Sequence, residues 1–147
     1  MDILSNFPER LKELMFDHDE IKSEALGAAI GIHGTSVRAW MRGKSMITLP
    51  NAIILADFFE CSLDYLAGER ENDEKIPPRP LPPFYDNLRK IMAEKGITRY
   101  ALVKDTEIKD VYFTKWAHGA LPDLITVIKL AKYLDVSLDY LVGRTDY

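Results

Sequence analysis

The sequence predicts an all-α protein built from two copies of one five-helix unit, joined by a proline-rich linker. The pentapeptide Ser-Leu-Asp-Tyr-Leu occurs at residues 62–66 and again at 137–141, and a glycine follows each copy two residues later. Leu26 and Trp40 are fourteen residues apart, as are Leu102 and Trp116. Similarity over this length indicates a duplication. We therefore predict domains at residues 1–70 and 84–147.

Each copy begins and ends with helical signals. In residues 7–15 and 84–92 the apolar positions recur at i, i+4, i+7 and i+8, the pattern of an amphipathic helix. A strongly apolar helix is expected at 52–59 and again at 127–134. In the second copy, Gly96 is suited to end the first helix, and Thr98 and Ser137 are suited to cap later ones.

The middle of each copy predicts a helix-turn-helix. In the first copy, a helix ends near Ile30, Gly31 permits a positive-φ turn, and a second helix begins near Gly34. Gly27 has no side chain, so the two helices can approach closely. The residues expected to face inward are Leu26, Ile30, Val37 and Trp40. In a DNA-binding motif of this kind, the second helix enters the major groove.

The segment 71–83 contains five of the eight prolines and separates the copies. Proline removes the backbone donor that a helix or sheet needs, so an extended polyproline II spacer is expected. Fully extended, it would reach about 40 Å at roughly 3.1 Å per residue. Its Pro-x-x-Pro spacings also suit an aromatic groove on a partner. The spacer is the favoured interpretation.

Composition narrows the classes of function. The chain has 147 residues, 47% of them hydrophobic, and a net charge of −4, which argues weakly against a protein coated in nucleic acid. No apolar run is long enough to cross a membrane, and Cys61, the single cysteine, is expected to be a buried thiol in a reducing cytoplasm. No catalytic constellation, phosphate-cradling loop or metal-ligand spacing occurs, so we expect no enzyme, cofactor or metal site.

Both copies carry Trp-x-x-Gly and the closing Ser-Leu-Asp-Tyr-Leu-x-Gly, and the first also has the Gly turn; with this pattern each copy resembles the lambda-repressor-like helix-turn-helix family of Cro/CI or XRE type. The resemblance covers both copies over their full length. It implies two tandem five-helix domains and a transcriptional regulator that binds a double-stranded DNA operator.

The resemblance also implies specific DNA contacts, position by position. The residue that opens the second helix touches a phosphate, here Ser23 or Arg99. A small hydroxyl usually caps the third helix, and His33 or Lys109 stands there instead. Base contacts fall on Gly34, Thr35, Arg38 and Ala39 in the first copy, and on Asp110, Val111, Thr114 and Lys115 in the second. Further phosphate contacts fall on Arg42, Lys44 and His118.

The first copy has the cleaner basic cluster, formed by Arg38, Arg42 and Lys44, and we expect the start of its third helix to be free of acid. Arg38 suits a bidentate contact with guanine, worth roughly 1–3 kcal/mol of discrimination. The alternative is that these three basic side chains are simply solvated and do not contact DNA. Its place on the recognition helix favours DNA contact.

The second copy departs further from the family pattern, because Glu107 replaces the turn glycine and Asp110 stands where the helix would meet the groove. Asp110 suits either a cytosine amino group or the positive end of the helix dipole. Lysines and acids alternate around it, so the face is mixed rather than basic. DNA contact and simple solvation stay equally open for Lys109 and Lys115.

Two functions follow. The leading hypothesis is a sequence-specific regulator of phage or mobile-element type, acting as a homodimer over half-sites about 34–36 Å apart or as a covalent pair on a site of unequal halves. The alternative is a protein-interaction module in which one or both copies bind another repressor or a toxin instead of DNA. An intermediate hypothesis is that one copy binds DNA while the other serves for association. We expect the first copy to bind DNA.

Overall fold

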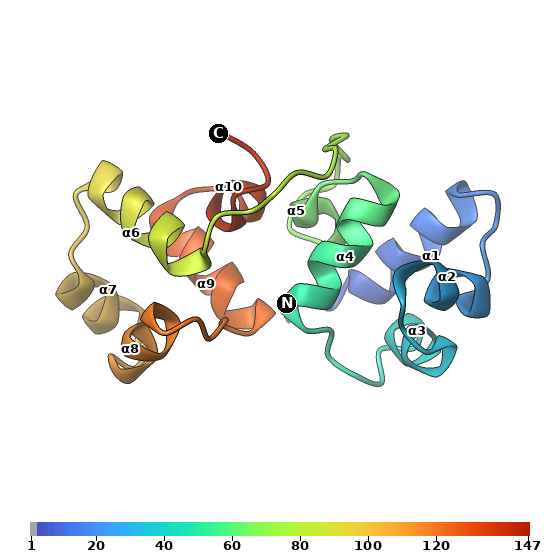
Figure 1. Ribbon diagram of the computed structural model, residues 1–147, viewed down its shortest axis with the longest axis horizontal. Helices are drawn as coiled ribbons and strands as arrows, with labels where there is room; N and C mark the ends of the chain where they lie inside the picture. The colour runs from blue at the N-terminus through green and yellow to red at the C-terminus, as the bar shows by residue number, and fades with distance from the viewer. Residues whose placement is uncertain (1–2) are drawn as a thin grey trace. The chain divides into compact units, whose positions relative to one another are not determined.

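The computed structural model describes residues 3–147 and forms two compact units, divided after Pro78. In those residues the structure has ten helices and no strand, which confirms the all-α prediction (Figure 1). The first unit contains α1 (Phe7–Asp17), α2 (Ser23–Ile30), α3 (Gly34–Met41), α4 (Leu49–Phe59) and α5 (Leu63–Leu66). The second unit contains α6 (Phe84–Lys95), α7 (Arg99–Thr106), α8 (Val111–Ala117), α9 (Leu124–Leu134) and α10 (Leu138–Val142).

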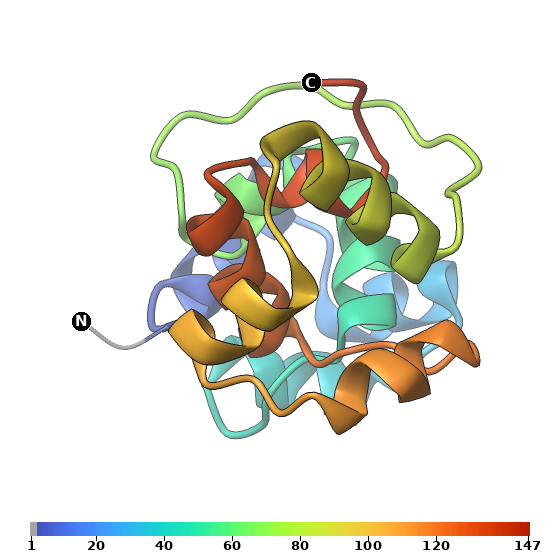
Figure 2. The same cartoon turned by 90° about the vertical axis from the view of Figure 1, so that its left-hand side faces the viewer.

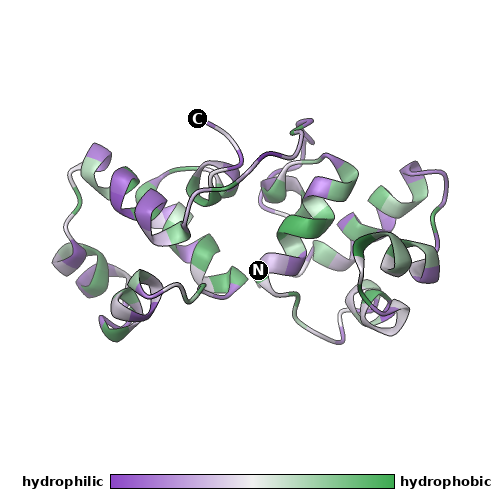
Figure 3. Cartoon of the chain, viewed as in Figure 1, coloured by the Kyte–Doolittle hydropathy of each residue, from purple (hydrophilic) through white to green (hydrophobic). Residues whose placement is uncertain are grey.

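Each unit buries its own hydrophobic core, to which α4 or α9 contributes several side chains. Figure 3 shows how hydrophobic residues are distributed along the helices. Trp40 and Trp116 are each 4% exposed, so both are core residues, as the spacing of the repeat predicts. Cys61 is fully buried, which confirms its expected place in the core.

Short polar side chains begin the helices where the sequence predicts them. Thr98 accepts a hydrogen bond from the backbone N–H of Ala101, and Ser137 accepts one from Tyr140, each at 3.0 Å. Ser62 caps α5 in the same way at 3.2 Å. Such caps satisfy backbone donors that a helix leaves unpaired at its start. Gly96 ends α6 with φ 67°, as expected.

The repeated pentapeptide attaches the last helix of each unit to the first. Its tyrosine hydroxyl donates to a carboxylate on the leading helix, from Tyr65 to Glu13 at 3.1 Å and from Tyr140 to Glu94 at 2.7 Å. The bond to Glu94 raises the pKa of Tyr140, whereas burial is the main cause of the raised pKa of Tyr65. These contacts give both tyrosines packing roles.

The proline-rich segment 71–83 has no helix or strand (Figure 2), and hydrogen bonds from residues near its middle attach it to each unit. The buried Ile76 donates its N–H to the carbonyl of Glu60 at 3.1 Å, within the first unit. Arg79 donates through Nε to the carbonyl of Gly143 at 2.9 Å and pairs with Asp146 at 3.0 Å, which lowers the pKa of Asp146. The spacer interpretation stays a prediction. The boundaries at 70/71 and 83/84 stay predictions.

In the second unit, the aspartate of the pentapeptide forms a buried ion pair. Asp139 and Arg144 are both buried, and the guanidinium donates to the carboxylate. The backbone N–H of Arg144 also donates to the carbonyl of Asp139 at 2.7 Å, so the pair fixes the chain after α10.

Replacing Arg144 with alanine should lower the free energy of unfolding of the second unit by about 3–5 kcal/mol, because Asp139 would lose the guanidinium that compensates its buried charge. Urea unfolding in a Trp40→Phe background measures this, since Trp116 then reports on the second unit alone. The exposed Arg89→Ala serves as the control and should cost less than about 1 kcal/mol. Equal losses in the two variants would contradict a structural role for the pair.

Candidate nucleic-acid interface

A left-handed turn joins the two helices of the motif in each unit. Gly31 ends α2 with φ 76°, and α3 begins three residues later, as predicted. Glu107 ends α7 with φ 63°, so it takes the conformation of the glycine that it replaces. A non-glycine residue there carries a steric cost, yet the second unit keeps the turn. The motif therefore has the same backbone plan in both units.

The packing of the two motif helices differs between the units. A Cβ at Gly27 would overlap the carbonyl oxygen of Ile32, so only glycine allows the observed approach of α2 to the chain before α3. This confirms the role predicted for Gly27. Val103 occupies the equivalent position in the second unit, where α7 and α8 pack less closely than α2 and α3 do.

Most of the residues expected to touch DNA in the first unit lie on or beside α3. Among these residues, the exposed ones are His33, Thr35, Arg42 and Lys44. His33 precedes α3 without a side-chain capping bond, as its residue type suggests. Gly34 is buried, and Ala39 is half-buried. The exposed arginine and lysine side chains thus come from the segment directly after α3, whereas Arg38 in its last turn is half-buried.

Arg38 is held by two residues of α2. Its Nη1 donates to Oγ of Ser23 at 3.3 Å and to the carboxylate of Glu24. Its side chain is still 40% exposed. The start of α3 carries no acidic residue of its own, as predicted, but the Glu24 carboxylate of α2 lies against Gly34 there. Sequence reasoning missed Glu24 because it belongs to the preceding helix, although an acid one residue after the helix start was a visible signal.

The second unit also has an arginine–carboxylate pair in its helix-turn-helix, built from other positions. Arg99 opens α7 and donates through Nε to Oδ1 of Asp110 at 2.7 Å, and through Nη2 to the carbonyl of Asp110 at 3.0 Å. Asp110 makes no side-chain bond to the amides of α8. In this structure the Asp110 carboxylate pairs with Arg99, and the two roles suggested by the sequence stay predictions.

The other residues singled out in the second unit form a mixed surface. Thr114, Lys109, Lys115 and His118 are exposed, and Nδ1 of His118 lies 2.7 Å from the carbonyl oxygen of Thr114. Val111 is 53% exposed, and its neighbour Tyr112 is 42% exposed. The outer face of α8 therefore presents apolar and aromatic groups beside its charges.

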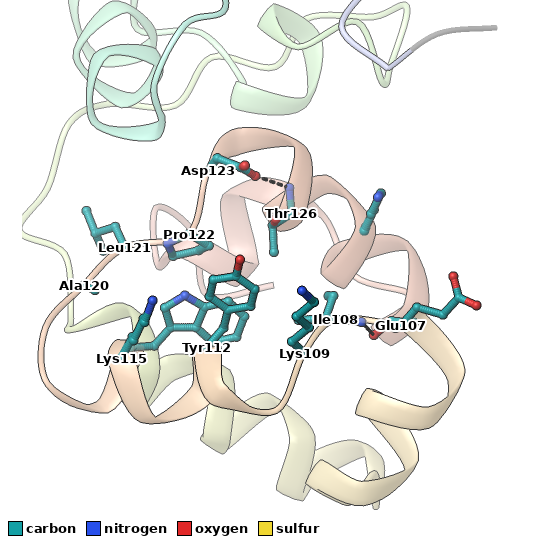
Figure 4. Close-up of a pocket in the computed structure, with 13 residues that line it drawn as sticks. Glu107, Ile108, Lys109, Tyr112, Lys115, Ala120, Leu121, Pro122, Asp123 and Thr126 are labelled. Carbon is teal, nitrogen blue, oxygen red and sulfur yellow. Dashed lines mark hydrogen bonds between the residues drawn. The ribbon is translucent and has the colours of Figure 1, made fainter.

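A groove of about 450 Å³ lies beside α8, between this helix and the segment before α9 (Figure 4). Tyr112 and Lys115 project from α8 toward the segment that carries Leu121 and Pro122. The Nζ of Lys115 is 5.4 Å from the centroid of the Tyr112 ring, within the range of a cation–π contact. The charged residues that line the groove are Glu107, Lys109, Lys115, Asp123 and Lys129. The groove is thus mixed in charge, as predicted for this face.

Two protein-family models match the chain, one in each unit. The family model of the Cro/C1-type HTH DNA-binding domain matches residues 87–146, and a helix-turn-helix family model matches residues 20–66. The chain carries two Cro/C1-type helix-turn-helix domains in tandem. No curated protein and no solved structure gives a significant match. The resemblance seen in the sequence is thereby confirmed, and a DNA-binding regulator is supported.

Two further properties concern residues 3–147 only. No helix in this range is both long and apolar enough to span a membrane. Within the same range, no three histidine, cysteine, aspartate or glutamate side chains are grouped so as to hold a metal ion.

Replacing Glu107 with glycine should raise the free energy of unfolding of the second Cro/C1-type domain by about 1 kcal/mol, because glycine adopts positive φ without a Cβ clash. Glu107→Ala is the matched control, since it removes the charge but keeps the Cβ. In the first domain Gly31→Ala should have the opposite sign, because a Cβ there meets no atom within 4 Å and only the positive φ opposes it. Urea unfolding measures all three. A stability gain shared by Glu107→Ala would assign the effect to charge rather than to the turn.

Proposed function

We propose that this protein is a sequence-specific transcriptional regulator of phage or mobile-element type, which places α3 and α8 in the major groove of its operator. The family matches support DNA binding by both domains. The exposed basic face at the end of α3 is the observation that carries the finer proposal.

On this face, Arg42 and Lys44 suit phosphate contacts that set the position of the domain, because both are exposed cations next to the recognition helix. Arg38 lies one turn earlier on α3 and suits a base edge. Thr35 is exposed near the start of the helix and adds a hydroxyl that either donates or accepts. Together these residues provide both the positioning and the sequence-reading parts of an interface.

The two domains offer different side chains at equivalent positions, so one chain acting alone would prefer a site of unequal halves. Thr114 and Lys115 replace Arg38 and Ala39 on α8. A homodimer in which each chain places one domain on DNA is the other arrangement that the family supports. Footprinting distinguishes them, because a perfect palindrome protected by single chains would contradict the unequal site.

Exposed aromatic and apolar side chains on the second domain favour a second function for it, which is the binding of a protein partner. Tyr100 is 77% exposed on α7, and Val111 and Tyr112 are exposed on α8. Exposed aromatic residues are enriched at protein interfaces. Under this candidate, the second domain binds a protein partner, such as another repressor or a toxin, while the first binds DNA.

Replacing Arg38 and Arg42 with alanine should remove most of the affinity for DNA without unfolding the chain, because both side chains are accessible to solvent. The operator is first obtained by selecting bound duplexes from a random-sequence pool, and affinity is then measured by titration at several salt concentrations. The slope of log K against log salt should become shallower by about 0.9 for each phosphate that the variant no longer neutralises.

Arg70→Ala with Lys75→Ala is the control, because it removes two exposed cations of the first unit that lie outside the helix-turn-helix. This pair should leave most of the affinity in place. If the Arg38 and Arg42 variant kept its affinity while Lys109→Ala with Lys115→Ala abolished it, the second domain would be the DNA reader. A wild-type affinity that does not change with salt would contradict DNA binding and favour the interaction module.

A further inference from the structure

We propose that Glu24 is a positioning residue for DNA recognition, which holds Arg38 so that one edge of its guanidinium is presented for base contact. The proposal rests on the proposed function of the first domain. Glu24 is exposed on the first turn of α2, outside every contact position implied by the family resemblance.

The hydrogen bonds of Arg38 leave a defined edge of its guanidinium for another acceptor. Nη1 donates to both Ser23 and Glu24. Among residues 3–147, no acceptor is found for the Nε or the Nη2 of Arg38. These two groups form a rigid parallel pair of donors, the geometry that suits two acceptors on one guanine edge. Because Arg38 is held at Nη1, its Nε and Nη2 donors stay available for a bidentate contact.

Gly34 makes this arrangement possible at the start of the recognition helix. A Cβ on residue 34 would overlap the carboxylate of Glu24, so a side chain there would push Glu24 away. The glycine thus has a second consequence beyond close approach to DNA, because it admits the carboxylate that holds Arg38. Restraining a long side chain before binding reduces the entropy cost of forming the contact.

In the second domain, the arginine of the helix-turn-helix is bound through the donors that Arg38 keeps available. Arg99 donates through Nε and Nη2, so its bidentate edge is occupied by Asp110. Asp110 stands at the position equivalent to Gly34, and Arg99 at the position equivalent to Ser23. Arg38 therefore keeps its Nε and Nη2 donors available, whereas the same donors of Arg99 are bound to Asp110. Base discrimination by arginine is assigned to the first domain.

The test compares Glu24→Ala with Glu24→Gln in the full chain, using a duplex selected by the wild type from random-sequence DNA. The base pair read by Arg38 is the one whose replacement weakens the wild type but not Arg38→Ala. Discrimination at this pair is the ratio of affinities for the selected and replaced duplexes, and a bidentate contact sets it at about 5- to 150-fold. Glu24→Ala should lose most of this ratio. Glu24→Gln should keep it, because the amide oxygen still accepts from Nη1.

Asp17→Ala is the control for net charge, since it removes one exposed carboxylate from the same unit at the end of α1 and should leave the ratio unchanged. Full discrimination in Glu24→Ala would overturn the positioning role while leaving DNA binding by the domain intact. Equal loss in the alanine and glutamine variants would also overturn it, because the field of the carboxylate would then be responsible. If the wild type bound no duplex, the proposed function would fail together with this inference.

Discussion

The left-handed turn between the two motif helices sets where every proposed contact lies, because it fixes the direction in which the recognition helix leaves the helix before it. Gly31 makes this turn in the first domain, and Glu107 makes it in the second with φ 63°. The turn brings the start of α2 against α3, and the start of α7 against α8. The arginine–carboxylate pairs of both domains form across this junction, over fourteen residues in one and eleven in the other.

Duplication has left two domains with one scaffold and different surfaces. The Ser-Leu-Asp-Tyr-Leu copies are identical and have structural roles, since they cap the last helix and attach it to the first. The outer faces of α3 and α8 differ, because α3 carries Arg38 whereas α8 carries the exposed Val111 and Tyr112. The binding preferences of the chain therefore depend on the residues that differ.

The helices, their caps and the core tryptophans could be predicted from the sequence, because they depend on local periodicity and on capping residues such as Thr98 and Ser137. The close approach at Gly27 was predictable for the same reason. The partners of Arg38 and Arg99 were not, because they depend on side-chain directions across a turn. The anchoring of Ile76 and Arg79 was likewise hidden, since proline content indicates an extended chain but not what the chain packs against.

The proposed function assigns the main DNA-reading surface to the first domain, where Arg38 keeps Nε and Nη2 available, whereas those groups of Arg99 are bound to Asp110. The most direct measurement is a titration of the ¹⁵N-labelled full chain with duplex DNA, followed by amide chemical shifts. We expect the largest shifts at low DNA concentration in α2, α3 and the loop through Lys44, with smaller changes in α7 and α8. Shifts confined to α7 and α8, with α3 unchanged, would contradict it.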